Sequence, residues 1–278
     1  MDYLLCPCCD GESRSHWASE SGFDVVRCGH CALLYVFPMP DPSYVESAVR
    51  SGKHKLGSSV VNVRSKRIDS KVSHYTKRMT SMIADVIARG EAVSWVDVGC
   101  GYGEFIEALQ RILPAGSTII GVEPMAHKAE AARQRGLNVI NDYLQPYQFE
   151  ADFISNMDVF SHIADYRGFL ATVVTNLKPA GEMIVETGNT ADLHSRRQAP
   201  NELGLPDHLV FLGRATADRY FASAGLRVKD VVEERFDTIL QMSKNLVKLA
   251  LGRPSFVTIP YTSPYRQLIF RVERESSV

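Results

Sequence analysis

The sequence has little net charge: 31 lysines and arginines stand against 32 aspartates and glutamates, giving a formal net charge of -1 at pH 7. A chain with this balance is not a globally basic protein that binds nucleic acid through its overall charge. It also lacks any apolar run near the roughly eighteen residues that a membrane-spanning helix needs. We therefore expect no membrane span and no nucleic-acid partner.

Internal repeats and low-complexity tracts are absent too, and the first residues lack the basic start and apolar core of a signal peptide. We therefore expect a cytoplasmic protein, whose reducing surroundings disfavour disulfides. Hydrophobic residues make up 45% of the chain and charged residues 23%, as in ordinary globular proteins. A chain of 278 residues can bury one large core and a small satellite.

Four of the six cysteines form two CxxC pairs. Cys6 and Cys9 make the first pair, and Cys28 and Cys31 make the second. The length of the segment between them is typical of a zinc site in which four thiolates surround the metal. We expect a structural zinc ion, because four thiolates leave no open coordination position for a substrate.

The prolines of Pro38-Met39-Pro40-Asp41-Pro42 end the cysteine-rich start, because they forbid a continuing helix. We take this segment as a domain boundary. The predicted organisation is a zinc-binding module at 1–42, a basic helical linker or lid at 43–90, and the main domain at 91–278.

The linker contains a basic stretch from Arg50 to Arg78, in which Asp69 is the one acidic residue. Its second half is predicted to be helical, since apolar residues from Ile68 to Val86 recur every three or four positions. Two interpretations of the positive charge are open. It forms either a solvated face or a lid that binds an anion such as a diphosphate.

From residue 93 onward, predicted strands and helices alternate. Strands are expected at 93–98, 118–122, 138–139, 151–155, 181–186, 226–233 and 266–272. One helix is expected to follow Gly103 and to continue to residue 113, and further helices are expected at 126–135, 166–177, 215–224 and 238–251. Such alternation predicts an α/β fold, with a parallel sheet and helices on both of its faces.

A glycine-rich turn follows the first of these strands. Asp97 precedes Gly99, Gly101 and Gly103, and a helix begins directly after them. Glycines permit a tight turn and a close approach of the backbone to a ligand at a helix N-terminus. Glu123 ends the next strand, where a carboxylate can accept both hydroxyls of an adenosine ribose. The GxGxG spacing differs from the GxGxxG of dinucleotide-binding proteins.

These segments resemble two motifs of a known family. Residues 97–103 are similar to the first motif of the Rossmann-like, S-adenosylmethionine-dependent methyltransferases, and Gly121-Val122-Glu123-Pro124 is similar to the second. The resemblance covers about residues 93–235. It implies that Asp97 and the glycine loop hold the methionine portion of S-adenosylmethionine, that Glu123 holds the ribose, and that Asp142 lies near the adenine amino group.

The two CxxC pairs and the apolar, proline-rich exit at 33–40 resemble a subgroup of that family. This subgroup includes enzymes that methylate deoxysugars on nucleotide carriers, and others that act on glycans and secondary metabolites. The resemblance implies a small-molecule acceptor, with phosphorylated and nucleotide-linked sugars among the candidates.

Methyl transfer from a sulfonium requires a positioned nucleophile and usually removal of its proton, for which histidine has a suitable pKa. His162 follows the fourth strand and Asp207-His208 follows the fifth, so both leave the sheet edge where ligands bind. In the sugar C-methyltransferases of the subgroup, a histidine in the first position is the base, and an acid–histidine pair in the second contacts the sugar. Leu205-Pro206, ahead of the pair, departs from that pattern.

Simpler roles and other functions stay open. His162 could cap the helix that begins near Asp165, and His208 could be a loop residue without a role. An RNA methyltransferase is a second candidate, since some ribosomal RNA enzymes join a zinc knuckle to this fold, but the net charge opposes it. A non-catalytic interaction protein is a third, which the intact glycine loop and Glu123 oppose.

Overall fold

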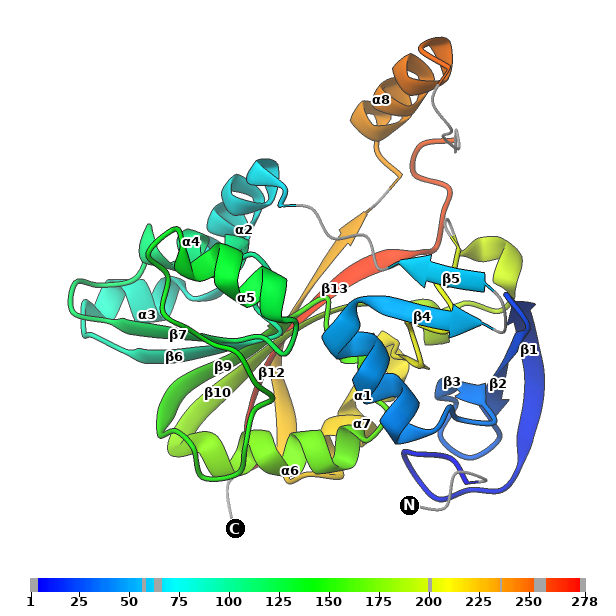
Figure 1. Cartoon of the computed structure of the whole chain (residues 1–278), viewed down its shortest axis with the longest axis horizontal. Coiled ribbons are helices and arrows are strands. Elements are labelled where there is room, and N and C mark those ends of the chain that lie inside the picture. The colour runs from blue at the N-terminus through cyan, green and yellow to red at the C-terminus, as the bar shows by residue number, and fades with distance from the viewer. Residues whose placement is uncertain are drawn as a thin grey trace.

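A seven-stranded sheet forms the centre of the computed structural model, which describes residues 5–56, 59–62, 67–199, 202–235, 237–252 and 259–275. The strand order is β12-β13-β10-β9-β6-β7-β8 (Figure 1). The strands are β6 (Ser94–Val98), β7 (Thr118–Val122), β8 (Val139–Ile140), β9 (Ala151–Met157), β10 (Leu177–Gly188), β12 (Leu226–Arg235) and β13 (Arg266–Arg274).

Six of the seven strands run in one direction, and β13 runs antiparallel to both of its neighbours, β10 and β12. The predicted α/β fold is therefore confirmed, with one reversed strand that the alternation of elements did not reveal. Because β12 is parallel to β10, the segment between β12 and β13 begins at the sheet edge where β6 and β9 also end.

Helices cover both faces of this sheet (Figure 1). Alternate residues of a strand point to opposite faces, so Phe153 of β9 joins one apolar cluster and its neighbour Ile154 joins the other. The first face is covered by α2 (Asp69–Met82), α3 (Ala84–Arg89), α4 (Glu104–Gln110) and α5 (Ala126–Arg133). The second face is covered by α6 (Tyr166–Asn176) and α7 (Arg214–Ala222).

The predicted helix after Ile68 is present but divided at Ile83, whose backbone departs from helical geometry between α2 and α3. Gly90 ends α3 in the left-handed conformation, with φ of +70°. Within the basic stretch, Arg50, Arg67 and Arg78 each form salt bridges with acidic side chains. Arg64 and Lys66 lie outside the described residues.

The N-terminal segment forms a separate, antiparallel sheet with the order β1-β2-β3-β11. Its strands are β1 (Arg14–Glu20), β2 (Phe23–Cys28), β3 (Leu34–Phe37) and β11 (Val210–Phe211). The last of these comes from the segment after β10, where Val210 pairs with Tyr35 of β3. The N-terminal sheet is therefore completed by the chain that directly follows Asp207-His208.

The proline-rich boundary leads into α1 (Pro42–Ser51), which the sequence analysis did not predict. Asp41 caps this helix by accepting a hydrogen bond from the Ser43 backbone N–H at 2.8 Å. Pro42 occupies the first turn, where no backbone donor is needed. A small hairpin of β4 (Lys53–Leu56) and β5 (Ser59–Asn62) follows.

The insertion between β12 and β13 carries α8 (Ile239–Ala250), which stands clear of the sheet and its helices (Figure 1). Asn245 is the one residue of this helix that is buried among the described residues. The described helices include none whose length and apolar character would allow it to cross a bilayer.

Candidate active site

A cavity of about 1010 Å³ lies at the carboxyl edge of the seven-stranded sheet, where β6, β7, β9 and β10 end. Gly103 is placed at the start of α4, beside this cavity rather than in its wall. The wall contains all the other predicted cofactor-binding and catalytic residues: Asp97, Gly99, Gly101, Glu123, Asp142, His162, Asp207 and His208. One space thus joins both sets of residues.

Glycine is required at the three positions of the loop for different structural reasons. A Cβ on Gly99 would lie 2.4 Å from Val159 Cγ2, and one on Gly103 would lie 2.2 Å from Leu137 Cδ1, so packing excludes side chains at both positions. Gly101 has φ of +56°, and a Cβ there would meet no atom within 4 Å. That open space belongs to the cavity, as expected where a backbone must approach a ligand closely.

Glu123 lies at the end of β7 and is 5% exposed. Its Oε2 accepts a hydrogen bond from the Gly101 N–H and its Oε1 from the Met125 N–H, both at 2.8 Å. Each carboxylate oxygen retains capacity for one further hydrogen bond. The pair of oxygens therefore fits the two vicinal hydroxyls of a ribose.

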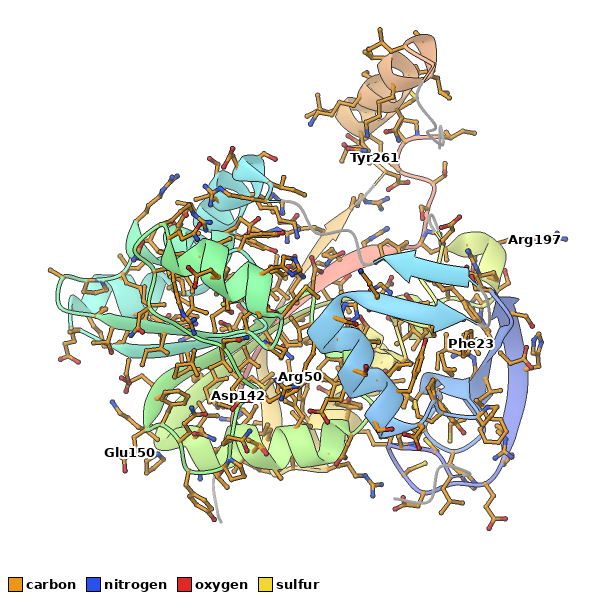
Figure 2. All side chains as sticks on the ribbon, in the orientation of Figure 1. Phe23, Arg50, Asp142, Glu150, Arg197 and Tyr261 are labelled. Atoms are coloured by element: carbon orange, nitrogen blue, oxygen red, sulfur yellow. The ribbon has the colours of Figure 1, made fainter. Side chains whose placement is uncertain are left out.

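Asp97 is the next-to-last residue of β6, just before the glycine loop, and is 1% exposed. Burial raises the pKa of this carboxyl to about 7, against the opposing effect of the Ser155 hydroxyl, which donates to Oδ1 at 2.7 Å. Asp142 lies further along the cavity wall, where Arg50 Nη2 of α1 donates to its Oδ1 at 3.5 Å (Figure 2). Helix α1 thus contacts the end of the cavity at which the adenine was expected.

His162 is held by Asp207. Its Nδ1 lies 2.8 Å from the backbone oxygen of Asp207 and 3.1 Å from the carboxylate Oδ1. Because both oxygens accept hydrogen bonds, Nδ1 must carry the proton. The neutral ring then has its free electron pair on Nε2, as a general base requires.

The two histidines are in contact but differ in basicity. Burial disfavours the protonated form of His162, yet the hydrogen bonds and charge of Asp207 outweigh it and raise the pKa. Burial, followed by the neighbouring His162, lowers the pKa of His208 to about 4. The ring centroids lie 4.7 Å apart with an edge-to-face orientation. His208 is therefore neutral near pH 7.

His162 does not cap the helix that begins near Asp165, so this alternative from the sequence analysis is wrong. Helix α6 is capped by Asp165, whose Oδ1 accepts a hydrogen bond from the Gly168 N–H at 3.0 Å. His162 instead ends a short 3₁₀ turn that begins at Phe160. Its side chain is directed to Asp207, in a segment more than forty positions away.

The loop that carries Asp207 is anchored by the N-terminal sheet. Glu20, the last residue of β1, accepts hydrogen bonds from the N–H groups of Leu203 at 2.9 Å and Gly204 at 2.8 Å. After the loop, the Val36 N–H of β3 donates to the Leu209 oxygen at 2.9 Å. The N-terminal sheet thus fixes the chain on both sides of Asp207.

The sequence analysis missed further polar residues of the wall, among them Glu186, Asp158 and Gln267. Glu186 of β10 is 3% exposed, and its Oε2 has no hydrogen-bond partner, while Arg78 pairs with Oε1. Burial, followed by the charge of Asp158, raises the pKa of Glu186 to about 7. Asp158 has φ of +59° and accepts a hydrogen bond from Gln267 at 2.9 Å. Glu186 could have been found, because it ends a predicted strand at the binding edge.

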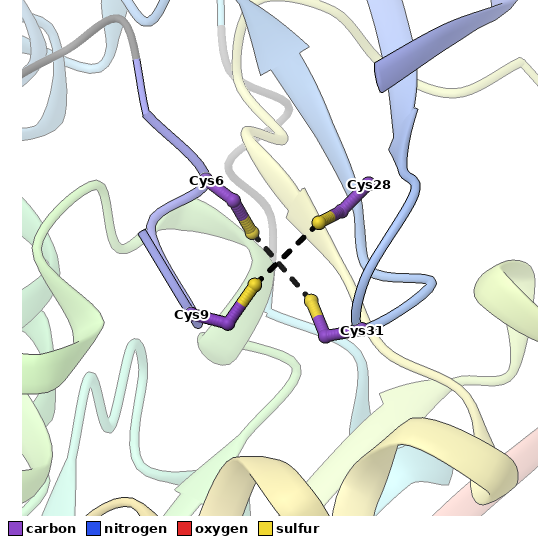
Figure 3. A group of neighbouring side chains, drawn as sticks. All are labelled: Cys6, Cys9, Cys28 and Cys31. Atoms are coloured by element: carbon purple, nitrogen blue, oxygen red, sulfur yellow. Dashed lines mark hydrogen bonds between the residues drawn. The ribbon is translucent and has the colours of Figure 1, made fainter. Parts of the chain in front are cut away.

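The four predicted metal ligands form one cluster (Figure 3). The Sγ atoms of Cys6 and Cys31 lie 3.5 Å apart, those of Cys9 and Cys28 lie 3.6 Å apart, and all four lie within 4.8 Å of one another. A tetrahedral zinc ion with bonds of about 2.3 Å requires sulfur–sulfur separations of about 3.8 Å. None of the six cysteines is part of a disulfide, so the four sulfurs of the cluster are available to a zinc ion.

The family model described as a methyltransferase domain matches residues 65–231. The chain belongs to this family. A ubiquinone biosynthesis O-methyltransferase of Chelativorans sp. (strain BNC1) is 33% identical over 160 residues, which are 50% of this chain and 61% of that protein. Its counterpart in Rhodopseudomonas palustris (strain TIE-1) is 30% identical over 108 residues, or 36% and 41% of the two chains. The chain thus spans less than two thirds of the length of these relatives.

Solved structures confirm the fold. The cyclase SpnF superposes with a TM-score of 0.53 at 16% identity, covering 72% of this chain and 82% of that one. A chain from the Haloferax volcanii complex of the Trm112 methyltransferase activator with a methyltransferase gives 0.51 at 17%, covering 76% and 95%. The predicted Rossmann-like fold and the predicted membership of a methyltransferase family are confirmed. The sugar subgroup stays a prediction.

Proposed function

We propose that the protein transfers a methyl group from S-adenosylmethionine to a small polar acceptor, with His162 as general base. The observation that carries this proposal is the bond from His162 Nδ1 to Asp207, which leaves Nε2 as the basic atom in the cavity that the glycine loop also lines. S-adenosylmethionine, when bound, supplies a methyl group activated on its sulfonium.

The residues around the glycine loop, which form the cofactor half of the cavity, support this assignment through the groups that they offer to a ligand. Gly101 offers open backbone, and the oxygens of Glu123 can accept the ribose hydroxyls. Asp97, just before the loop, and Asp142, at the α1 end, complete the predicted set. Gly99 and Gly103 act indirectly, since their lack of a side chain lets the loop pack against Val159 and Leu137.

In the proposed mechanism, His162 Nε2 accepts the proton of the acceptor as the acceptor atom bonds to the methyl carbon. The carbon–sulfur bond breaks, and its electron pair stays on sulfur. The resulting imidazolium is stabilised by Asp207, whose carboxylate is 3.1 Å from Nδ1. His208 stays neutral and can hydrogen bond to the acceptor beside the reacting atom.

A sugar is the acceptor class that we propose. The cavity wall also contains Asp158, Glu186 and Gln267, which offer several hydrogen-bonding groups to a molecule with many hydroxyls. The match of the zinc module and the acid–histidine pair to sugar methyltransferases supports this class. The names of the O-methyltransferase relatives support a hydroxyl oxygen as the atom that is methylated. Phosphorylated and nucleotide-linked sugars are included in the proposal.

We further propose that the four-cysteine cluster holds one structural zinc ion. Cys6, Cys9, Cys28 and Cys31 supply thiolates only, which is the donor set of closed, structural sites. The metal would fix the ends of β2 and β3 and, through β11, the position of Asp207. An RNA acceptor is less well supported, because the arginines of the basic stretch that the structure describes are paired with acids.

The test is turnover of a His162→Ala variant with a panel of free, phosphorylated and nucleotide-linked sugars. General-base catalysis is worth about 10²- to 10⁴-fold, so kcat should fall by that factor. Calorimetry should find the affinity for S-adenosylmethionine unchanged. His194→Ala, at an exposed histidine outside the cavity wall, is the matched control. Unchanged turnover in His162→Ala would remove this residue from the mechanism.

A further inference from the structure

Helix α8 presents an apolar surface that the described part of the chain leaves uncovered. Apart from Met242, which is half-buried, its large apolar residues are between 44% and 66% exposed. They are Ile239, Leu240, Leu246, Val247, Leu249 and, directly after the helix, Leu251. A contiguous exposed apolar surface of this kind indicates an interaction site.

The charged and amide side chains of α8 lie on one side. At 100° per residue, Lys244, Lys248, Gln241 and Asn245 fall within about 100° of arc. The remainder is apolar apart from Ser243, whose hydroxyl donates to the Ile239 carbonyl of the same helix at 3.0 Å. Asn245, the buried residue, lies on the polar side, so the apolar arc faces away from the protein. This orientation is opposite to that of a surface helix packed on a core.

The charge of the insertion has a single sign. Residues 238–265 contain three basic residues, Lys244, Lys248 and Arg253, and no acidic residue, although the whole chain is nearly neutral. A second copy of the insertion would add three more basic residues and no acidic residue to pair with them. An anionic surface would instead attract these basic residues while it covers the apolar arc.

The base of the insertion is fixed to the body. Asp237 accepts hydrogen bonds from the backbone N–H of Ser263 at 2.6 Å and, through its own carbonyl, of Tyr261 at 2.8 Å. Tyr261, which is exposed, lies below α8 (Figure 2), and Ile259, two residues before it, is exposed as well. A few residues on, Tyr265 lines the catalytic cavity. The helix is thus held outward on a stalk that begins at the cavity.

We propose that α8 docks the protein onto an anionic lipid surface. Its apolar arc lies at the boundary of the acyl chains, Lys244 at the edge of the arc contacts the lipid phosphates, and Lys248 adds electrostatic attraction to the anionic surface. Tyr261 occupies the head-group level, which aromatic residues with a polar tip favour. This inference is independent of the methyl-transfer proposal, because it rests on residues that lie outside the cofactor and base positions.

The experiment is co-flotation of the full chain with vesicles of phosphatidylcholine alone and of phosphatidylcholine mixed with phosphatidylglycerol. Wild-type protein should float with the mixed vesicles, and less so at high salt. Lys244→Glu with Lys248→Glu should lower the partition coefficient by at least about fivefold per lysine. Arg111→Glu with Arg197→Glu makes the same change in net charge at exposed positions elsewhere and should bind as wild type does.

A second variant tests the apolar arc. Leu246→Gln with Leu249→Gln keeps good helix formers and should lower binding by about tenfold per leucine. Its affinity for S-adenosylmethionine should equal that of wild type, which separates loss of docking from misfolding. The proposal is overturned if wild-type protein ignores both vesicle types, if the arginine control loses binding equally, or if sedimentation finds a dimer that the leucine variant dissociates.

Discussion

The part of the cavity that we propose for the cofactor and the part that we propose for the acceptor, here called the cofactor half and the acceptor half, are built in different ways. The cofactor half comes from one continuous stretch, in which β6 and β7 pair in parallel and bring Asp97 opposite Gly121. The acceptor half brings together His162, Glu186 and Asp207, which follow or end different strands and depend on the N-terminal sheet. The first half is local and made largely of backbone, whereas the second is made of side chains that tertiary contacts hold in place.

This difference predicts that a substitution can impair acceptor binding and methyl transfer without impairing cofactor binding, and the reverse. The glycine loop is fixed by packing within the main domain, where Val159 and Leu137 contact it. The Asp207 loop depends on Glu20 and on Arg27 of β2, whose guanidinium donates to the Leu193 oxygen at 2.7 Å. Damage to the N-terminal sheet should therefore reach the acceptor half and spare the cofactor half.

Removal of zinc should give the largest effect. A structural zinc site contributes on the order of 10 kcal/mol of apparent free energy, so Cys28→Ser or a strong chelator should unfold the N-terminal sheet. Methyl transfer should be abolished, because β11 and the Asp207 loop lose their support. Affinity for S-adenosylmethionine, measured by calorimetry, should change by less than about threefold, or roughly 0.7 kcal/mol.

Cys8→Ser is the matched control for zinc removal. Cys8 belongs to the same turn but not to the four-sulfur cluster, so its variant should retain one zinc per chain by metal analysis. Freshly purified wild-type protein without zinc would contradict the metal proposal. A Cys28→Ser variant that loses S-adenosylmethionine binding as well would show that the two halves are coupled.

Gly101→Val tests the cofactor half and should give the second-largest effect. Its φ of +56° is strained for a β-branched residue, and the new side chain would occupy open space in the cavity. Affinity for S-adenosylmethionine should fall by about 100-fold or more, equivalent to roughly 2.7 kcal/mol. Gly136→Val imposes a similar backbone strain, at φ of +81°, on a residue outside the cavity wall, and should lose stability only.

The same difference decides how much the sequence could predict. Asp97 and Glu123 were found from a motif, and His162 from the rule that ligands bind at the carboxyl edge of a parallel sheet. The anchoring of Asp207 was not predictable. Strand β11 has two residues, too few for a periodic pattern, and Glu20 lies more than 180 positions from the loop that it holds. Only the folded chain reveals this contact.

The burial of Glu186 could not be predicted from the sequence either. Glu186 was predicted as the end of a strand, but its unpartnered oxygen and its burial are properties of the folded chain, and burial with the charge of Asp158 raises its pKa against the opposing effect of Arg78. Helix α1 was missed because its prolines were taken only as a boundary, although Pro42 suits the first turn of a helix. Zinc, the individual site roles and the cytoplasmic location stay predictions.

Asp207→Asn should give a moderate effect within the acceptor half. The carboxylate opposes the influence of burial and raises the pKa of His162, so its removal should lower that pKa. The acid limb of the pH–rate profile, where His162 loses its proton to become the base, should move to lower pH. Turnover should fall by about tenfold, less than the 10²-fold minimum for loss of a base, because the Asp207 carbonyl still orients Nδ1. An unshifted acid limb would argue against His162 as the titrating group.

Glu20→Gln should give the smallest effect, and it tests the link between the N-terminal sheet and the acceptor half most directly. The charged carboxylate is 17% exposed and accepts hydrogen bonds from the Leu203 and Gly204 N–H groups and from Arg196. A neutral amide keeps one acceptor oxygen, so about 1 kcal/mol should be lost from the anchoring of the loop. The KM for the acceptor should rise about fivefold, since the loop that presents His208 becomes less ordered. Zinc content and the affinity for S-adenosylmethionine should stay at wild-type values. Because Glu20 is not part of the cavity wall, an equal fall in kcat with unchanged KM would mean that the N-terminal sheet acts on the base itself rather than on acceptor binding.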